Sequence, residues 1–170
     1  KEFIEKHYSR EKRISYKKLD ENGGISVNTN AAIEMADGEY LMLCDHDDTL
    51  EPDALYEIVR AVNEKSADVI YTDEDKVSMD GQQYFDPNFK PDYNLFRLRE
   101  NNYICHIFVV RKSLADKVGY LRTEFDGAQD FDFIFRCCEQ ADSIVHIPRV
   151  LYHWRCHMDS TAADPESKKY

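Results

Sequence analysis

An apolar run that stops at a cluster of acids constrains the fold of this chain more than any other feature. Residues Leu41 to Cys44 are apolar, and Asp45, Asp47 and Asp48 follow at once. The pattern predicts a buried strand that delivers carboxylates to the edge of a sheet, where open α/β sheets bind ligands. Crowded carboxylates repel each other unless a cation lies among them, and hard oxygen ligands favour Mg²⁺ or Mn²⁺. We therefore expect a divalent metal and a phosphate-bearing substrate at this turn.

Two other interpretations of the same residues stay open. Asp48 and Thr49 also suit the start of the following helix, because Asp and Thr cap helices well. Asp45, Asp47 and Thr49 match the Asp-x-Asp-x-Thr spacing of a phosphatase family, in which Asp45 would be a nucleophile and Asp47 an acid/base. A phosphate-release assay would discriminate that alternative.

The remaining pattern predicts strands that alternate with helices. The sequence favours a polar helix over residues 1–12 and further helices over 26–36, 52–65, 112–118 and 129–140; apolar residues recur at helical spacing in 26–36. Strands are expected at 13–19, 40–44, 67–72, 103–111, 143–148 and 150–155. This order predicts an α/β fold with a mixed, mostly parallel sheet flanked by helices.

Three further expectations follow from local composition. The strand at 67–72 is expected to end at Asp73, Glu74 and Asp75, which would give a second acidic strand end beside the first. Residues 79–94 are turn-rich and are expected outside the sheet core. The helix at 129–140 is expected to bury Phe131, Ile134, Phe135 and Cys138. The polar tail after Thr161 is expected to be loose.

Composition excludes some classes of partner. A net charge of −11 argues against nucleic acid, because phosphate backbones are bound by basic surfaces. No apolar run approaches the roughly 20 residues of a membrane span, so no transmembrane segment is expected. The five cysteines show no C-x-x-C spacing and fit reduced thiols in a cytoplasmic protein. A length of 170 residues suits a single domain over residues 1–170.

Six separated motifs, taken in order, resemble family 2 glycosyltransferases of the GT-A type. They are Asn22 to Ser26 with Asn30, Ala36 to Tyr40, Asp45 to Asp48, Tyr71 to Lys76, Gln129 to Asp132, and Pro148 to Arg155. Three stretches are similar to bacterial enzymes of surface-polysaccharide synthesis, rhamnosyltransferases among them: Phe89 to Asp92, Asn102 to His106, and Tyr152 to Arg155.

The resemblance implies a Rossmann-like GT-A domain and a metal-dependent, inverting transfer. The sugar would move from a nucleotide-diphosphate donor to a surface polysaccharide or a lipid-linked glycan. By the same resemblance, Asp47, Asp45 and His153 would hold Mn²⁺ or Mg²⁺. The donor's diphosphate would be bound by Asp45, Asn30 and Arg155.

The resemblance also assigns the acceptor side of the site. Asp130 would be the catalytic base that takes the proton of the attacking hydroxyl, and Asp73, Glu74 and Trp154 would face the acceptor. Each role has a structural alternative: Asp130 as a helix-start acid, Trp154 as a core residue, the acids after residue 72 as a solvated turn, and His153 as a hydrogen-bonded structural histidine.

Two departures from the family pattern bear on activity. The family begins with a strand-helix-strand unit that holds the nucleotide base and ribose, and its Pro-x-Tyr-Asn-like and Asp-Asp-Gly-Ser-like stretches are not found here. We therefore expect an N-terminally truncated domain with an unpaired sheet edge and half a donor pocket. Residues 1–170 alone would then have weak or no transferase activity, or act as a non-catalytic glycan- or metal-binding fragment. Thr29 also stands where many relatives carry Arg.

The resemblance further implies a location. Nucleotide sugars are a cytosolic supply in this family, so the protein is expected in the cytoplasm. A lipid-linked acceptor would add peripheral contact at the inner membrane face.

Overall fold

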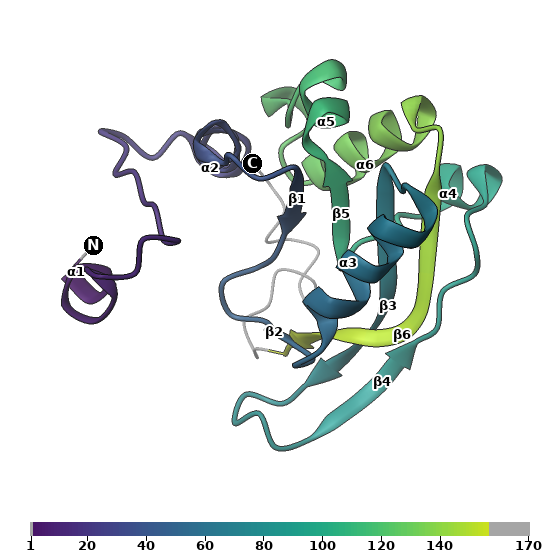
Figure 1. The fold of residues 1–170 in the computed structure, drawn as a ribbon, viewed down its shortest axis with the longest axis horizontal. Helices are drawn as coiled ribbons and strands as arrows, with labels where there is room; N and C mark the ends of the chain where they lie inside the picture. The colour runs from purple at the N-terminus through teal and green to yellow at the C-terminus, as the bar shows by residue number, and fades with distance from the viewer. Residues whose placement is uncertain (1, 157–170) are drawn as a thin grey trace.

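The computed structural model describes residues 2–156, drawn as a ribbon in Figure 1; the predicted loose tail after Thr161 lies outside them. The elements are α1 (Glu2–Tyr8), α2 (Gly24–Met35), β1 (Tyr40–Leu43), β2 (Thr49–Leu50), α3 (Ala54–Lys65), β3 (Val69–Val77), β4 (Tyr84–Asn88), α4 (Leu95–Glu100), β5 (Phe108–Arg111), α5 (Lys112–Val118), the 3-10 turn η1 (Thr123–Phe125), α6 (Gln129–Gln140) and β6 (Ile144–Arg155).

The strands form one mixed sheet in the order β1-β5-β3-β6-β2, with β4 paired to β3. Parallel pairing is confined, among the described strands, to β3 and β6, and the other pairs are antiparallel. The predicted α/β fold with a mixed, helix-flanked sheet is confirmed, but its parallel share is smaller than predicted. The reason is β5, which runs antiparallel between β1 and β3, so that the two acidic segments are not on neighbouring strands.

Alternation along β3 builds a core on each face of the sheet, because successive side chains of a strand point to opposite faces. Val69 and Tyr71 join the cluster that packs against α5 and α6. Ile70 joins the cluster that packs against α3. Figure 1 shows α3 crossing in front of the sheet, with α5 and α6 near its upper end. The first half of β3 is therefore buried on both faces of the sheet.

The predicted helices after residue 23 are confirmed within a few residues, and the helix at 129–140 matches α6 at both ends. Its buried face is different from the predicted one. Ile134 and Cys138 are buried as expected, but Phe133 and Cys137 are the fully buried neighbours, while Phe131 and Phe135 are half-buried. The face of α6 that packs against the sheet is therefore rotated by about one residue from the face that the apolar spacing indicated.

The predicted strand at 13–19 is wrong. These residues form no regular element, and α1 together with residues 9–22 extends away from the sheet (Figure 1). A strand needs a neighbour that satisfies its backbone N–H and C=O groups, and no strand of residues 2–156 runs beside this segment.

The predicted end of a strand at Asp73 is also wrong. β3 continues through Asp73, Glu74 and Asp75 because β6 on one side and β4 on the other supply backbone partners. The two last predicted strands are one strand, β6, with irregular register against β3 near Thr72 and Asp73. Neighbouring strands, rather than local polarity, set these boundaries.

β4 was not predicted, because its five residues are all exposed and include Pro87. Proline is tolerated at sheet edges, where its missing N–H faces no partner strand. No helix within residues 2–156 is long and apolar enough to cross a membrane.

Candidate functional site

An open cavity of about 1180 Å³ lies beside the carboxyl end of β1, between α2 and the start of α6. Five of the predicted site residues line it, although they are spread over 110 residues of sequence: Asp45, Asp47, Asp130, Trp154 and Arg155. The acidic turn, α6 and the end of β6 therefore meet at one place. Thr29, the departure from the family pattern, also lines this cavity.

β6 fixes the acidic turn after β1. The hydroxyl of Tyr152 donates to a carboxylate oxygen of Asp48 and accepts from the backbone N–H of Asp45 at 3.3 Å. Burial, with the Asp48 contact, raises the pKa of Tyr152, so its hydroxyl stays protonated and can donate. Arg155 donates from its backbone to Asp48 at 2.8 Å and from Nε to the carbonyl of Asp47 at 2.7 Å. Asp48 is thus occupied in holding the turn, and Asp53 precedes the helix instead.

The surroundings of Asp45 on balance disfavour the charged form of its carboxyl. Burial raises the pKa of its carboxyl, and the carboxylates of Asp48 and Asp47 act in the same direction. His106 acts in the opposite direction, with its Nε2 at 3.6 Å from Oδ2 of Asp45. A cation placed near these acids would therefore be stabilised.

Asp130 lies in the first turn of α6, and its two hydrogen-bond partners both contact the same carboxylate oxygen. Asn102 Nδ2 and Cys105 Sγ both contact Oδ2 of Asp130, at 3.0 and 3.3 Å. Burial and the adjacent Asp130 raise the pKa of the Cys105 thiol, so the thiol stays protonated and donates. Asp132 contacts Arg122 and Arg136 instead, away from this position.

Four predicted site residues do not line the cavity, namely Asn30, Asp73, Glu74 and His153. Asn30 joins α2 to the segment before η1, donating to the carbonyl of Leu121 at 2.8 Å and accepting from its N–H at 2.9 Å. Asp73 is buried, accepts from the backbone of Lys90 at 2.8 Å and contacts His146 at 2.9 Å. Both therefore have structural partners where donor and acceptor roles were expected.

Glu74 lies behind the cavity. Its Oε2 accepts from the backbone N–H of His106 at 2.8 Å and contacts the ammonium of Lys90 at 3.1 Å. It therefore supports a cavity-lining residue, which is a different place from the acceptor side that was expected.

His153 is turned away from the predicted metal ligands. Its ring nitrogens contact Asp75 at 2.6 Å and Glu51 at 3.2 Å. In β6 its neighbours Tyr152 and Trp154 contact the His106 ring, so alternation sends His153 to the opposite face. The structure does not bring His153 together with Asp45 and Asp47, and its geometry is that of a hydrogen-bonded structural histidine.

No role was predicted from the sequence for His106, Cys105 or Lys90. All three lie within stretches that carried the family resemblance, which was the available signal. Their contacts with Asp45, Asp130 and Glu74 connect segments far apart in sequence, so spacing could not indicate them.

The donor set fits a metal that is shared with a substrate. Among residues 2–156, no three His, Cys, Asp or Glu side chains are grouped so that they could enclose a metal ion. Asp45 and Asp47 supply two carboxylates on one turn. Mg²⁺ is commonly held in this way, by one or two carboxylates together with substrate phosphates.

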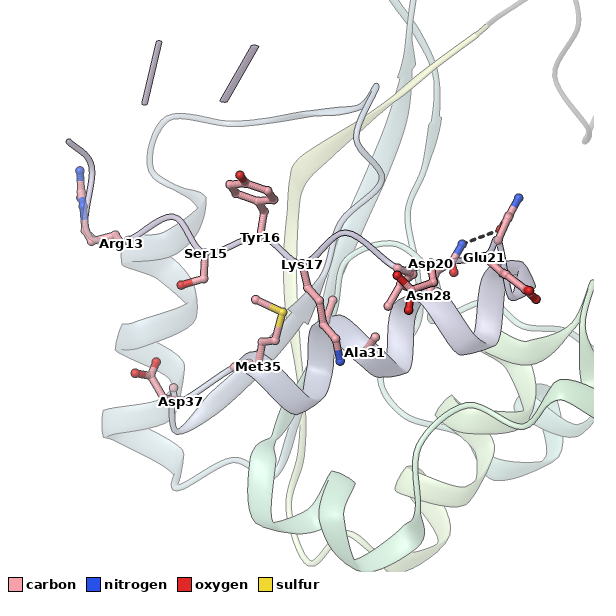
Figure 2. Close-up of a pocket in the computed structure, with 15 residues that line it drawn as sticks. Arg13, Ser15, Tyr16, Lys17, Asp20, Glu21, Asn28, Ala31, Met35 and Asp37 are labelled. Carbon is pink, nitrogen blue, oxygen red and sulfur yellow. Dashed lines mark hydrogen bonds between the residues drawn. The ribbon is translucent and has the colours of Figure 1, made fainter. Parts of the chain in front are cut away.

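A second cavity of about 870 Å³ lies on the other side of α2 and is bordered by the irregular segment before it. Figure 2 shows the Lys17 side chain of that segment running toward α2 near Ala31, while Tyr16 points away from the helix. Asn28 Nδ2 donates to Oδ1 of Asn22 at 2.9 Å. α2 thus borders both cavities.

Comparison with known proteins identifies relatives of the chain. The family model described as Glycosyl transferase family 2 matches residues 1–119. The chain is 45% identical over 152 residues to a Sinorhizobium fredii protein named Uncharacterized protein y4gI, covering 88% of this chain and 17% of that protein. It is 37% identical over 147 residues to the O-antigen biosynthesis protein RfbC of Myxococcus xanthus, covering 86% of this chain and 12% of that protein. The chain thus spans less than a fifth of either relative.

A solved structure shares the fold. The S. aureus TarS 1-349 structure in complex with UDP-GlcNAc superposes with a TM-score of 0.75 at 21% identity. The match covers 96% of this chain and 48% of the TarS chain.

Proposed function

Because the chain belongs to glycosyl transferase family 2, we propose that its cavity binds a nucleoside-diphosphate sugar and contributes to sugar transfer onto a bacterial surface glycan. The convergence of Asp45, Asp47, Asp130, Trp154 and Arg155 on one cavity carries this proposal. The named role of RfbC in O-antigen biosynthesis supports the acceptor class, a polysaccharide or a lipid-linked glycan.

In the proposed reaction, Asp45 and Asp47 would hold Mn²⁺ or Mg²⁺ where the donor's diphosphate binds. Such an ion would offset the charge that grows on the leaving nucleoside diphosphate. The guanidinium of Arg155 borders the same cavity and already fixes the carbonyl of Asp47. His106 supplies a second basic group beside Asp45.

Asp130 acts as the general base. It takes the proton of an acceptor hydroxyl as that oxygen attacks the anomeric carbon, which inverts the configuration there. Because Oδ2 accepts from Asn102 and Cys105, Oδ1 is the oxygen left to accept the proton. The proton would then pass from the Asp130 carboxyl to solvent through the open side of the cavity, which restores the carboxylate.

The family match favours sugar transfer over the phosphatase alternative. That alternative rests on the spacing of Asp45, Asp47 and Thr49 alone, whereas the match to glycosyl transferase family 2 covers residues 1–119. Five free cysteines support a reducing compartment for the protein. We therefore propose cytoplasmic transfer, with peripheral contact at the membrane where a lipid-linked acceptor is used.

The first experiment is calorimetric titration of UDP, and separately dTDP, into the chain with and without Mn²⁺. The TarS complex with UDP-GlcNAc supports UDP as the first nucleotide. We expect binding that needs the metal and is lost in Asp47→Ala. Glu64→Ala, which removes an exposed acid on α3, is the matched control for overall charge and should bind as before.

Binding to a folded chain that is unaffected by Asp47→Ala would contradict the metal assignment. No binding of either nucleotide would refute the donor site. Binding without turnover of a UDP-sugar would favour the non-catalytic binding module. If transfer occurs, Asp130→Asn should lower turnover about 100- to 10,000-fold with unchanged UDP affinity.

A further inference from the structure

Lys90 buries its charge behind the candidate site. Its side chain is 0% exposed, and its ammonium contacts Oε2 of Glu74 at 3.1 Å. The same nitrogen contacts three successive backbone carbonyls, those of Ile104 at 3.2 Å, Cys105 at 3.3 Å and His106 at 2.7 Å. An ammonium has three N–H donors, so four oxygens share them and the ammonium is fully engaged.

Burying a charge in this way is costly. Burial lowers the pKa of Lys90, and the Glu74 carboxylate only opposes that shift. Replacing a buried ion pair by apolar groups is often neutral or stabilising. Net stability is therefore a weak account of Lys90, whereas its hold on three consecutive carbonyls is specific to one segment.

That segment, residues 102–106, contacts both acids to which the proposed function gives central roles. Asn102 and Cys105 donate to Oδ2 of Asp130, at 3.0 and 3.3 Å. His106 places its Nε2 at 3.6 Å from Asp45. Any shift of the segment would displace the partners of both acids together.

The ring of His106 is fixed from two further sides. It stacks on Tyr152, with ring centroids 5.1 Å apart and planes 13° from parallel, and its centroid is 6.1 Å from that of Trp154. Its backbone N–H donates to Glu74, the carboxylate that also contacts Lys90. Lys90 and Glu74 thus hold the segment from behind while the ring faces the cavity.

We propose that Lys90 is a positioning residue of the site: its ammonium holds segment 102–106 so that His106 stands beside Asp45, and Asn102 and Cys105 orient Asp130. This inference rests on the proposed function for its consequence, since it concerns the same donor site. Lys90 touches neither substrate nor reacting atoms and acts through the segment it holds.

Lys90→Met tests the proposal, since it removes the ammonium and keeps a side chain of similar length. Lys76→Met is the matched control, because Lys76 lies on β3, is 34% exposed and pairs with Asp86 away from the segment. Three quantities are measured on each variant: the thermal unfolding curve, the affinity for UDP with Mn²⁺, and, without metal, the NMR signal of the His106 ring C–H. His106→Gln assigns that signal.

In Lys90→Met we expect a folded chain whose His106 signal moves toward that of an exposed histidine, because the ring leaves the stacking contact with Tyr152. UDP affinity should fall about 10- to 100-fold, as for other residues that orient the ligands of a metal. Lys76→Met should leave both quantities unchanged. This signal reports the placement of one ring, so a general loss of stability would not mimic it in a folded variant.

A folded Lys90→Met chain with an unchanged His106 signal would overturn the proposal. A shifted signal with unchanged UDP affinity would overturn it as well, because Lys90 would then be structural only. Failure of the unmodified chain to bind UDP refutes the proposed function instead, and is seen before any variant is made. If Lys90→Met does not fold, Glu74→Gln weakens the same hold, and unchanged UDP affinity in that variant would contradict the proposal.

Discussion

At the scale of single residues, the face of a strand decides which side chains reach the cavity. Trp154 lines it, whereas His153, one position earlier, is buried between Asp75 and Glu51. Both residues belong to the same motif, and a role in the site was predicted for each, His153 as a metal ligand and Trp154 on the acceptor side. Only the direction of the side chain separates a cavity residue from a structural one.

The orientation of His153 gives a prediction at this scale. His153→Gln should leave metal-dependent UDP affinity within about twofold, whereas it should lower the free energy of unfolding by about 1–3 kcal/mol through the lost contacts to two carboxylates. Calorimetry and thermal unfolding measure the two effects. Loss of UDP binding in a folded His153→Gln chain would instead support the assignment of His153 as a metal ligand.

Trp154 provides an intrinsic probe of the cavity, because it is the single tryptophan of the chain. We expect its fluorescence to change on titration with Mn²⁺ and UDP, with the same midpoint as the calorimetric curve. Asp47→Ala should remove the change. An unaltered emission while calorimetry reports binding would mean that the nucleotide lies elsewhere.

At the scale of elements, ion pairs of Asp132 with Arg122 and Arg136 fix the position of α6, and with it that of Asp130. Asp132 accepts from Arg122 and Arg136, and Arg136 also donates to the carbonyls of Gly119 and Tyr120, both at 2.7 Å. These contacts join α6 to the segment between α5 and η1. The start of α6 is therefore held by Asp132, two residues from the proposed base.

The ion pairs of Asp132 also predict that stability depends on pH. Burial acts to raise the pKa of Asp132, but hydrogen bonds from Arg122 and Arg136 outweigh it and lower that pKa. The stabilisation by these ion pairs is fully present above the pKa of Asp in an unfolded chain, about 4. It is lost as the pH falls through the lowered pKa of Asp132 in the folded chain. Asp132→Asn should cost about 1–3 kcal/mol at pH 7, and the difference should shrink in acid.

Denaturant unfolding at several pH values measures this effect. Asp116→Asn is the control, since Asp116 is 47% exposed and pairs with Lys112 within α5. Its free energy of unfolding should stay close to that of the unmodified chain, because exposed ion pairs contribute little. A cost for Asp132→Asn that is equal at pH 7 and in acid would contradict the ion-pair account.

At the scale of the whole molecule, the sheet has an open edge at β1. Among the strands of residues 2–156, β1 pairs with β5 alone, as the predicted unpaired edge required. The adjacent helix α2 exposes apolar side chains, with Val27 41% and Met35 37% exposed. Open edges beside apolar surface favour pairing with another chain.

We therefore expect this chain to self-associate as its concentration rises. Sedimentation velocity over about a hundredfold range of concentration should show the increase, and Val27→Glu with Met35→Glu should reduce it by adding charge to the patch. Phe96→Glu is the control, because Phe96 is 76% exposed on α4, away from β1. Sedimentation that does not change with concentration would contradict the prediction.

The sequence by itself determined the features that depend on local pattern. The apolar run before Asp45 indicated β1 and the acidic turn, helical spacing indicated α2, α3 and α6, and the ordered motifs indicated the family. These features persist because strand alternation, helix periodicity and turn residues act over a few neighbours.

Only the tertiary structure decided which polar residues serve the cavity. Asp73 and Glu74 stay within β3 because β4 and β6 flank it, and His153 is directed away by its place in β6. The position of the Lys90 ammonium is set by backbone carbonyls more than ten residues away. The physical reason is the same in each case: burial and strand pairing join distant segments, and the partner that satisfies a polar group is fixed by packing, which local spacing does not specify.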